Sequence, residues 1–277
     1  MHACNTKKIG LIAGYGAFPL EVVRALNLQG FEVHVVAAKE ETSPEIETVA
    51  ASVCWLHVGK IGGMIKALQR AGVERVVMAG KVQKLHLFRN FRPDFVAVKA
   101  LMGLKDRRDD TLMLKVVDLL ADAGIRVESQ VRYVPSMVAQ EGLIFGAPLN
   151  KKQHVEIAFG VPQACAIAAL DIGQTVVVQD TAVLAVEAIE GTDEAVKRGG
   201  ALGNGQACVV KVAKPNQDLR FDVPAIGPDT LHTMVASGCT TLAVQAGCTL
   251  LIEQEQLPDL AKKLGISVYG VVVTHEG

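Results

Sequence analysis

The sequence predicts an α/β protein with two domains, and three observations support this fold class. At 277 residues the chain is long enough for one large domain or two of ordinary size. Half of its residues are hydrophobic but only 4% are aromatic, a composition typical of buried parallel strands covered by helices. Short apolar runs alternate with helix-like patterns in both halves of the chain, which indicates layers of strands and helices in each.

The N-terminal half predicts a Rossmann-like parallel sheet with helices. We expect, in order, a strand, a turn, a helix, a strand, a helix and a strand at residues 8–13, 14–16, 20–28, 31–36, 62–69 and 75–78. Ligands of open parallel sheets bind beyond the carboxyl ends of the strands, so the turns at 14–17 and 80–82 should lie near each other at one edge. Both turns are candidates for contacts with a nucleotide.

The first of these turns, Gly14-Tyr-Gly16-Ala-Phe-Pro19, is similar to the dinucleotide fingerprint G-x-G-x-x-G. Its third glycine is replaced by Pro19, so the pattern favours NAD only weakly. Proline suits the first turn of a helix, and the free backbone N–H groups there suit a phosphate or a uracil carbonyl. A plain strand-to-helix turn is the alternative interpretation.

Phenylalanines and basic residues are interleaved before the next helix, which we expect at 112–120. They are Phe88, Arg89, Phe91, Arg92, Phe95 and Lys99. The formal net charge of −1, with both signs interspersed, argues against nucleic acid as a partner and favours a solvated helix face here. A surface that meets anionic lipid headgroups is a third interpretation. Asp109 or Asp110 either caps the helix or projects into a site at its start.

The regular patterns are lost between Val134 and Lys152, where proline and glycine accumulate. We therefore predict a first domain at 1–134, a junction at 135–152 and a second domain at 153–277 with a mixed sheet. We expect strands at 175–179 and 182–188, as a hairpin or as neighbours. The other helices are expected at 156–169, 192–197, 228–236 and 257–264, and the other strands at 207–212, 220–223, 241–245, 249–252 and 267–273.

The stretch from Lys214 to Gly227 carries the densest polar chemistry of the second domain. It places amide, guanidinium, ammonium and carboxylate groups between proline and glycine residues, with apolar segments on both sides. Asp222 lies near the end of the expected strand at 220–223, beside a loop, where a carboxylate can face a cleft. A polar turn in which Asp222 accepts backbone hydrogen bonds is the alternative.

Glu190-Gly-Thr-Asp193 is a second candidate segment, in which Thr192 is placed to cap a helix and Asp193 lies in the first turn. The amino end of a helix also binds phosphate, and a carboxylate there can hold a metal ion that neutralises the phosphate. The glycines at 199, 200, 203 and 205 predict a flexible loop after this helix.

Six cysteines are scattered through the chain without a Cys-x-x-Cys pair. This is typical of small core residues in a reducing compartment, so we expect a cytoplasmic protein. No segment approaches the roughly 20 apolar residues that a membrane-spanning helix needs. Contact with a membrane surface stays open.

Seven motifs run through both halves in a fixed order. They are Gly14-x-Gly-Ala-x-Pro19, Asp109-Asp110, Asp171-Ile-Gly-Gln174, Glu187, Glu190-Gly-Thr-Asp193, Lys214-Pro-x-Gln217 and Arg220-x-Asp-Val-Pro-x-Ile-Gly-Pro228. Together they resemble the UDP-2,3-diacylglucosamine pyrophosphatases of the LpxI type, in the same order and spacing. The segment from Lys214 to Pro228 is the most specific part of the resemblance. Tyr15 stands where members often carry glycine, and Ala225 replaces a frequent threonine.

The resemblance implies hydrolysis of UDP-2,3-diacylglucosamine to UMP and 2,3-diacylglucosamine 1-phosphate, a cytoplasmic, Mg²⁺-dependent step of lipid A synthesis. It implies an N-terminal UDP-binding domain and a C-terminal α/β hydrolase-type mixed-sheet domain of its own family. Peripheral contact with the cytoplasmic face of the inner membrane and a homo-oligomer both stay open.

The resemblance also places functional residues on this sequence. The essential aspartate falls on Asp222. The phosphate and metal environment falls on Gln174, Thr192, Asp193 and Lys214, and the uridine side falls on Gly14, Gly16, Ala17 and Gly80.

The chemistry of pyrophosphate hydrolysis agrees with these residue types. The negative phosphates repel a nucleophilic water, so cleavage needs a cation across the phosphates and carboxylates that hold it. We expect Asp222 and Asp193 to bind Mg²⁺, and Asp222 to orient or deprotonate the water. Lys214 and the amides at 192–193 would stabilise the developing charge. A sensor that binds the nucleotide sugar or lipid without turnover, and a nucleotide-dependent oxidoreductase, are the two alternatives.

Overall fold

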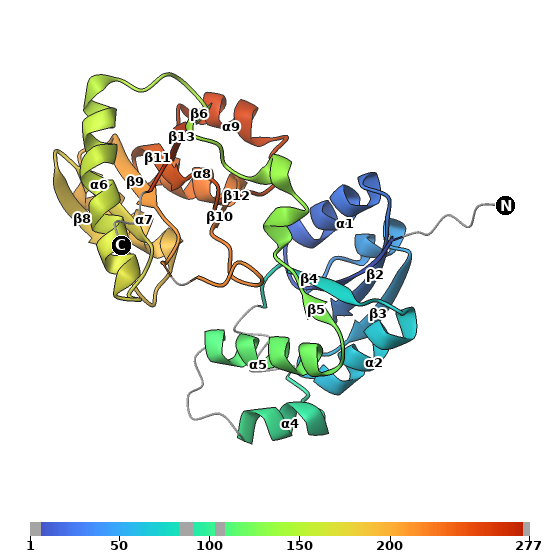
Figure 1. The fold of residues 1–277 in the computed structure, drawn as a ribbon. Coiled ribbons are helices and arrows are strands. Elements are labelled where there is room, and N and C mark those ends of the chain that lie inside the picture. Colours follow the sequence, from blue (N-terminus) through green and yellow to red (C-terminus); the bar gives the residue numbers. More distant parts are fainter. Residues whose placement is uncertain (1–6, 83–90, 103–108, 216, 274–277) are drawn as a thin grey trace. The chain divides into compact units, whose positions relative to one another are not determined.

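The computed structural model describes residues 7–82, 91–102, 109–215 and 217–273, and the chain divides into two compact units (Figure 1). Unit 1 comprises Met1–Val134 together with Leu219–Phe221, and unit 2 comprises Pro135–Asp218 and Asp222–Gly277. Three residues that follow most of unit 2 in the sequence thus belong to unit 1. One of them, Phe221, packs against the hydrophobic core of unit 1.

Unit 1 is built on a five-stranded parallel sheet, which confirms the predicted Rossmann-like sheet with helices. The strand order is β3-β2-β1-β4-β5, the order found in doubly wound nucleotide-binding folds. The strands are β1 Lys7–Ala13, β2 Phe31–Ala38, β3 Ser52–Leu56, β4 Arg75–Ala79 and β5 Arg126–Val127. Two strands were not predicted from the sequence: β3, an edge strand, and β5, which has two residues.

Helices cover both faces of this sheet. They are α1 Phe18–Leu28, α2 Ile61–Ala71, α4 Phe95–Met102 and α5 Asp109–Asp122, with 3-10 turns at Pro44–Thr48 and Gln130–Arg132. Leu68 of α2 and Leu120 of α5 share one core with Val76 of β4. Figure 1 shows α1 on the opposite face of the sheet, where its buried residues recur at helical spacing.

Unit 2 is built on a six-stranded mixed sheet of order β6-β13-β11-β9-β7-β8, which confirms the predicted mixed sheet. The strands are β6 Gly142–Phe145, β7 Thr175–Gln179, β8 Ala182–Val186, β9 Ala207–Lys211, β11 Cys239–Gln245 and β13 Ser267–Val271. The central strands β9, β11 and β13 are parallel, whereas β6, β7 and β8 pair antiparallel. β10 Ala225–Ile226 and β12 Leu250–Leu251 form a separate parallel pair.

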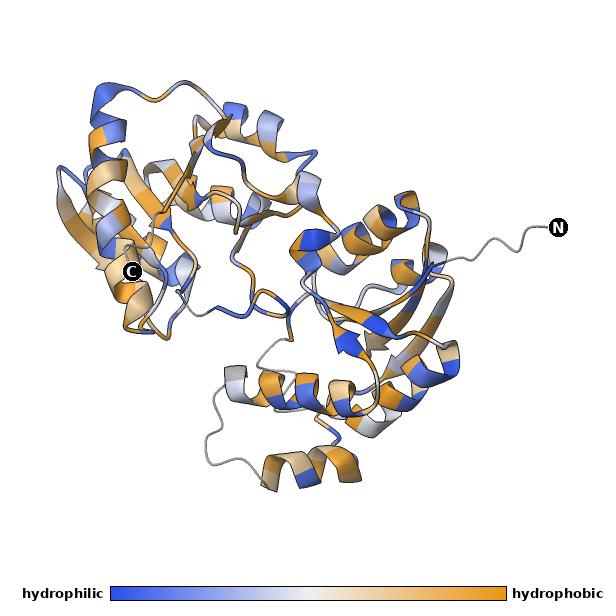
Figure 2. Cartoon of the chain, viewed as in Figure 1, coloured by the Kyte–Doolittle hydropathy of each residue, from blue (hydrophilic) through white to orange (hydrophobic). Residues whose placement is uncertain are grey.

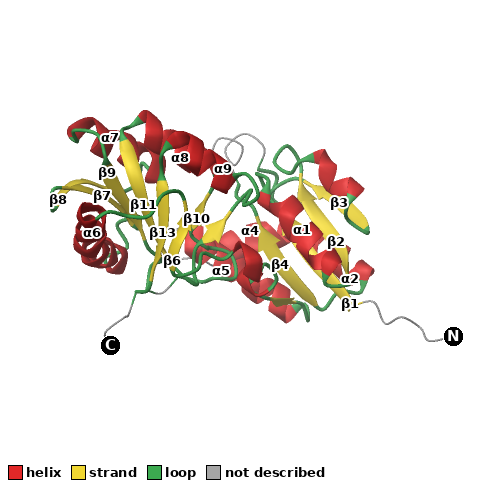
Figure 3. Cartoon of the chain, turned by 90° about the horizontal axis from the view of Figure 1, so that it is seen from above, coloured by secondary structure: helices red, strands yellow, loops and turns green. Residues whose placement is uncertain are grey.

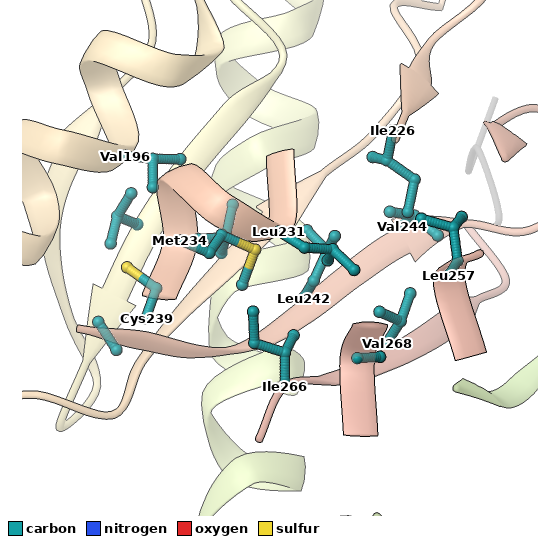
Figure 4. Close-up of a cluster of buried hydrophobic side chains, with 14 of the residues drawn as sticks. Val196, Ile226, Leu231, Met234, Cys239, Leu242, Val244, Leu257, Ile266 and Val268 are labelled. Carbon is teal, nitrogen blue, oxygen red and sulfur yellow. The ribbon is translucent and has the colours of Figure 1, made fainter. Parts of the chain in front are cut away.

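The helices of unit 2 lie on both faces of its sheet (Figure 3). They are α6 Lys151–Ala169, α7 Thr192–Leu202, α8 Pro228–Ala236 and α9 Leu257–Leu264, with a 3-10 turn at Pro135–Met137. Successive strand residues serve opposite cores, because side chains alternate along a strand. Val209 and Leu242 face α7, α8 and α9, a cluster shown in Figure 4, whereas Val210 faces α6.

Helix α7 contradicts the predicted flexible loop at its C-terminal end. Gly199 and Gly200 are buried residues inside the helix. A Cβ atom on Gly199 would lie 2.5 Å from Cβ of Val177, and one on Gly200 would overlap the carbonyl of Ser237. These glycines are therefore close-packing positions, and the sequence prediction took them for flexible ones.

The predicted strand at 220–223 is also wrong. The N–H of Asp222 donates to the carbonyl of Asp218 at 3.0 Å, so the chain makes a turn there. The strand in this region is β10, which begins at Ala225, immediately after Pro224. Proline lacks the N–H that a strand ladder uses, so Pro224 contributes only its carbonyl, which accepts from the N–H of Leu250 at 2.8 Å.

Several predicted features fall outside the described residues. These are Phe88, Arg89, Cys4 and the side chains of Asp109 and Asp110. Among the helices of the described segments, none is both long and apolar enough to span a membrane.

Candidate functional site

Polar residues of unit 2 gather at one end of its sheet. Strands β9 and β11 end there, while the antiparallel strand β7 begins there and β8 ends. The register places Lys211 opposite both Thr175 and Val244, the residue before Gln245. Gln174 precedes β7 at the same end, and Glu187 follows β8 there, with its N–H donating to the carbonyl of Thr175. Four strands thus deliver polar side chains to one edge.

A buried carboxylate, a partly buried hydroxyl and a buried ammonium form the centre of this cluster. The hydroxyl of Thr192 donates to Oε1 of Glu187 at 2.9 Å, and Nζ of Lys211 donates to Oγ1 of Thr192 at 3.0 Å. Oε2 of Glu187 accepts from the N–H of Gln174 at 3.3 Å. Glu187 and Lys211 are each only 8% exposed. Buried charges are costly unless they are paired and hydrogen-bonded, and these hydrogen bonds offset that cost.

Local sequence explains this arrangement. Lys211 is the last residue of β9, whose five residues are all buried, so the strand itself carries the ammonium group into the interior. Gly173 lies against the backbone of Glu187, where a Cβ atom would overlap the Glu187 carbonyl. Thr192 is the first residue of α7, after Gly191, which has φ +87°. Only glycine adopts that conformation readily, so the helix starts at this point.

Lys214 lies three residues beyond the end of β9 and is held on two sides. Its Nζ contacts Oδ1 of Asp171 at 2.6 Å, and its N–H donates to Oε1 of Gln217 at 2.9 Å. The intervening backbone is fixed as well. Val212 donates to the carbonyl of Gln174 at 3.0 Å, and Ala213 donates to Oε1 of Gln245 at 2.8 Å.

Three buried polar atoms of this region have no hydrogen-bond partner among the residues that the structure describes. They are Oε1 of Gln174, Oγ1 of Thr175 and Nε2 of Gln217. Buried polar atoms of native proteins are almost always satisfied, and leaving one unsatisfied costs roughly 1–3 kcal/mol. Unsatisfied donors and acceptors beside two lysines are what a site offers to a polar, anionic ligand.

The structure thus brings three of the predicted site residues, Gln174, Thr192 and Lys214, into one region. Asp193 lies on the exposed side of the first turn of α7, next to Thr192. Asp222 is partly buried in the loop before β10. That these two carboxylates share one ion stays a prediction. Across 7–82, 91–102, 109–215 and 217–273, no three His, Cys, Asp or Glu side chains form a metal-binding group.

Lys211 and Gln245 were not predicted as site residues, and Glu187 and Asp171 were named only as parts of the family motifs. The sequence contains a pattern that identifies Lys211 and Gln245 as candidates. Lys211 ends the apolar run Ala-Cys-Val-Val, and Gln245 ends Leu-Ala-Val, so each is a polar residue at the carboxyl end of a buried strand. Such positions in α/β folds frequently face ligands.

The cysteines near this sheet are structural. Burial raises the pKa of the Cys239 thiol to about 11, and burial also raises the pKa of Cys208. Both thiols therefore stay protonated near neutral pH, and a nucleophilic thiolate at either position is excluded. The cysteines of the described segments are all free: Cys54, Cys165, Cys208, Cys239 and Cys248.

The two glycine turns of unit 1 lie side by side, which confirms the neighbourhood expected for them. Tyr15 and Lys81 exchange backbone hydrogen bonds of 2.7 and 3.2 Å. A Cβ atom on Gly14 would lie 2.7 Å from the carbonyl oxygen of Lys81, and one on Gly80 would lie 2.7 Å from that of Tyr15. Both glycines are needed for this close approach.

Gly16 and Ala17 lead from this contact into α1. Gly16 has φ +104° with open space around its Cα, and Ala17 is the N-cap of α1, without a side-chain cap. The first N–H groups of a helix lack intrahelical partners, so this end of α1 offers donors to a ligand. Binding of a nucleotide by Gly14, Gly16, Ala17 and Gly80 stays a prediction.

Comparison with known proteins covers both units. Residues 8–137 match the sequence model of the LpxI N-terminal domain, and residues 140–269 match that of the LpxI C-terminal domain. The chain is 30% identical over 276 residues to UDP-2,3-diacylglucosamine pyrophosphatase LpxI of Caulobacter vibrioides, covering 96% of this chain and 98% of that protein.

Two solved structures show only weak likeness. The biotin carboxylase domain of Hydrogenobacter thermophilus 2-oxoglutarate carboxylase has a TM-score of 0.27 at 14% identity, covering 64% of this chain and 35% of that one. A UDP-N-acetylmuramate:L-alanyl-γ-D-glutamyl-meso-diaminopimelate ligase from Neisseria meningitides has a TM-score of 0.30 at 13% identity, covering 95% and 77%. Neither score supports an argument about the fold.

The family matches follow the two units in order and span nearly the whole described chain, and the full-length relative agrees with them. The chain belongs to the LpxI family.

Proposed function

We propose that this chain hydrolyses the pyrophosphate bond of UDP-2,3-diacylglucosamine, releasing UMP and 2,3-diacylglucosamine 1-phosphate for lipid A biosynthesis. The observation that carries the proposal is the cluster of Glu187, Thr192 and Lys211, beside Lys214 and two buried atoms without a described partner, Oε1 of Gln174 and Nε2 of Gln217. It supports hydrolysis in the C-terminal unit, which we assign as a hydrolase domain of its own family. The named activity of the Caulobacter relative supplies the substrate.

The cluster is suited to a phosphate group in three ways. Lys214 and Lys211 supply positive charge, and Nε2 of Gln217 supplies a free donor. The N–H groups at the start of α7, around Thr192, lack intrahelical partners and carry the positive end of the helix dipole. Preorganised donors of this kind stabilise the charge that develops in phosphoryl transfer.

Mg²⁺ would be held by carboxylates of this chain together with phosphate groups of the substrate. Mg²⁺ is commonly held by one or two carboxylates, with water and substrate phosphates completing its shell, so a cage of protein carboxylates is not needed. Asp193, exposed at the start of α7, and Asp222, in the loop before β10, would hold it. When bound, the ion would neutralise the phosphates and polarise the bond that breaks.

Asp222 has a separate part in the proposal. Its carboxylate would orient or deprotonate the water that attacks the sugar-side phosphorus, with UMP as the leaving group. Lys214 would be positioned by Asp171 and Gln217, its observed partners, to contact the phosphate. In unit 1, the N–H groups of Gly16 and Ala17 would contact the uridine nucleotide.

We place the reaction in the cytoplasm, at the inner face of the inner membrane. The free thiols of the five described cysteines support a reducing compartment. The substrate carries two acyl chains and a nucleotide, so a membrane face is where it accumulates.

The decisive experiment incubates the purified chain with UDP-2,3-diacylglucosamine, with Mg²⁺ or with a chelator, and analyses products by mass spectrometry. We expect UMP and 2,3-diacylglucosamine 1-phosphate in equal amounts, formed with Mg²⁺ and suppressed by the chelator. Tight binding of the substrate without product would instead assign a sensor. Product formed equally well in the chelator would reject the role of Asp193 and Asp222 as metal ligands.

A further inference from the structure

Helix α4 of unit 1 presents an apolar face to solvent. Phe95 is 82% exposed, Met102 is 83% exposed and Val98 is 41% exposed. These residues follow the spacing i, i+3, i+7, so they lie on one side of the helix. Figure 2 shows α4 mostly in the orange of hydrophobic residues. The solvated helix face favoured from the sequence is confirmed, since this side of α4 is exposed, and its composition is largely hydrophobic.

The opposite face of α4 is already used. Ala97 and Ala100 are buried, and Val96 packs against Gly62 of α2, so small residues hold the helix against unit 1. Phe95 and Met102 therefore do not contribute to the hydrophobic core of unit 1. An exposed pair of large apolar side chains on one short helix marks an interaction surface.

The start of α4 is fixed by a cap that also removes negative charge from the surface. Oδ1 of Asp94 accepts from the N–H of Ala97 at 3.0 Å, and Oδ2 accepts from the N–H of Gly63 at 3.2 Å. The carboxylate thus points into unit 1. Arg92 and Lys99, the cations of segment 91–102, are both exposed.

Apolar side chains flanked by exposed cations are the composition of helices that lie in the interface of an anionic bilayer. Over its eight residues α4 is about 12 Å long, enough to insert Phe95 and Met102 side by side. We propose that α4 is a membrane-docking helix whose Phe95, Val98 and Met102 enter the acyl region of an anionic lipid bilayer while Arg92 and Lys99 contact headgroup phosphates.

The choice of a bilayer as the partner rests on the proposed function. A substrate with two acyl chains resides in a lipid surface, and an enzyme docked on that surface meets it at high local concentration. Docking itself needs no substrate, so it can be measured separately from turnover.

The test measures binding of the full chain to sedimenting vesicles of phosphatidylcholine alone or mixed with phosphatidylglycerol, neither containing substrate. Wild type should bind the anionic vesicles. Phe95→Ser/Met102→Ser should lower the partition coefficient by about tenfold or more, since each side chain loses its apolar burial. Arg92→Glu/Lys99→Glu should lower it by about tenfold on anionic vesicles and little on neutral ones.

A matched control removes exposed apolar side chains elsewhere. Leu28 is 90% exposed and Ile189 is 94% exposed, so Leu28→Ser/Ile189→Ser makes an equal change in surface polarity. This control should bind like wild type. Wild type that stays off anionic vesicles, or a Phe95→Ser/Met102→Ser variant that binds as tightly as wild type, would overturn the proposal.

Two further measurements separate the alternatives. Sedimentation velocity of Phe95→Ser/Met102→Ser should match wild type; loss of a dimer with unchanged vesicle binding would assign the face to a second copy and reject the membrane. Turnover of detergent-dispersed substrate should be unchanged in this variant. If wild type releases no UMP, the proposed function fails, while the vesicle result still decides the role of α4.

Discussion

Each unit has, among its described residues, a carboxylate that is buried, bound by a hydroxyl and close to a cation, and the two carboxylates differ in their surroundings. In unit 1, Glu128 is 9% exposed and accepts a hydrogen bond from the hydroxyl of Tyr133, with Nη1 of Arg132 3.7 Å away. In unit 2, Glu187 is bound by Thr192, which is bound in turn by Lys211.

The cations distinguish the two sites. The Arg132 side chain is 70% exposed, so water solvates its charge and the arginine adds little to the carboxylate. Lys211 is 8% exposed, and unpartnered polar atoms lie at the same sheet end. The comparison teaches that a buried carboxylate alone does not mark a site. The buried cation next to Glu187 sets unit 2 apart, since unit 1 also has a buried atom without a described partner, Oε1 of Gln130.

The largest expected effect tests this difference in the cations. Lys211→Met leaves Glu187 as a buried charge without its ammonium neighbour, so we expect a loss of about 3–5 kcal/mol in the free energy of unfolding. Arg132→Met, the matched change in unit 1, should cost at most about 1 kcal/mol. Urea unfolding followed by circular dichroism measures both. Equal losses would show that burial of the cation is not the distinction.

The next effect separates chemistry from stability. Asp222→Asn should lower kcat by about 10²-fold or more, because the amide cannot accept the proton of water or ligate a cation as a carboxylate does. The free energy of unfolding and the affinity for UMP should stay close to wild type. Steady-state kinetics and calorimetry check these values. A variant with wild-type turnover would remove Asp222 from the mechanism.

A third prediction compares the two hydroxyls. Thr192→Val and Tyr133→Phe each remove one donor from a buried carboxylate and should each cost about 1–3 kcal/mol of stability. Only Thr192→Val should also lower kcat/KM, by about tenfold, because Thr192 starts the helix that would face the phosphate. Kinetics on both variants under conditions where they remain folded gives the answer. A matching kinetic loss in Tyr133→Phe would erase the contrast between the units.

The smallest effect appears only at high pH. Burial first, and then the hydrogen bond to Glu128, raise the pKa of Tyr133 to about 12. In the unfolded chain a tyrosine loses its proton near pH 10, so between about pH 10 and 12 the unfolded state binds fewer protons than the folded state. The contribution of the Tyr133 hydroxyl to the free energy of unfolding is therefore fully present below pH 10 and is lost as the pH rises to 12. Unfolding of wild type and Tyr133→Phe across this range should show a shallower decline in the variant.

The elements of unit 2 were largely predictable because their local signals agree with the fold. Pro228 and Leu257 open helices that end where the pattern ended, and strand 175–179 is exact. The predictions failed where tertiary packing overrides local pattern. The glycines of α7 are inside a helix because Val177 and Ser237 leave no room for side chains.

The site was predictable only in part, for a related reason. Thr192 and Lys214 lie in recognisable local patterns, a helix start and a polar loop, so both can be identified from the sequence. Lys211 carries a weaker signal, a single lysine after four apolar residues, and the register that places it beside Thr175 is what gives this signal its meaning. Long-range strand pairing brings these residues together, and one sequence does not contain that pairing explicitly.

The glycines of α7 also limit how this protein could be engineered. Replacing a helical glycine by alanine is a standard route to thermostability and gains roughly 0.5–1 kcal/mol when the site has room. At Gly199 the added methyl would push the helix off Val177 and carry its opposite end, with Thr192, away from Glu187. A consensus design that replaces these glycines with strong helix formers would therefore disrupt the contact between Thr192 and Glu187 in the candidate site.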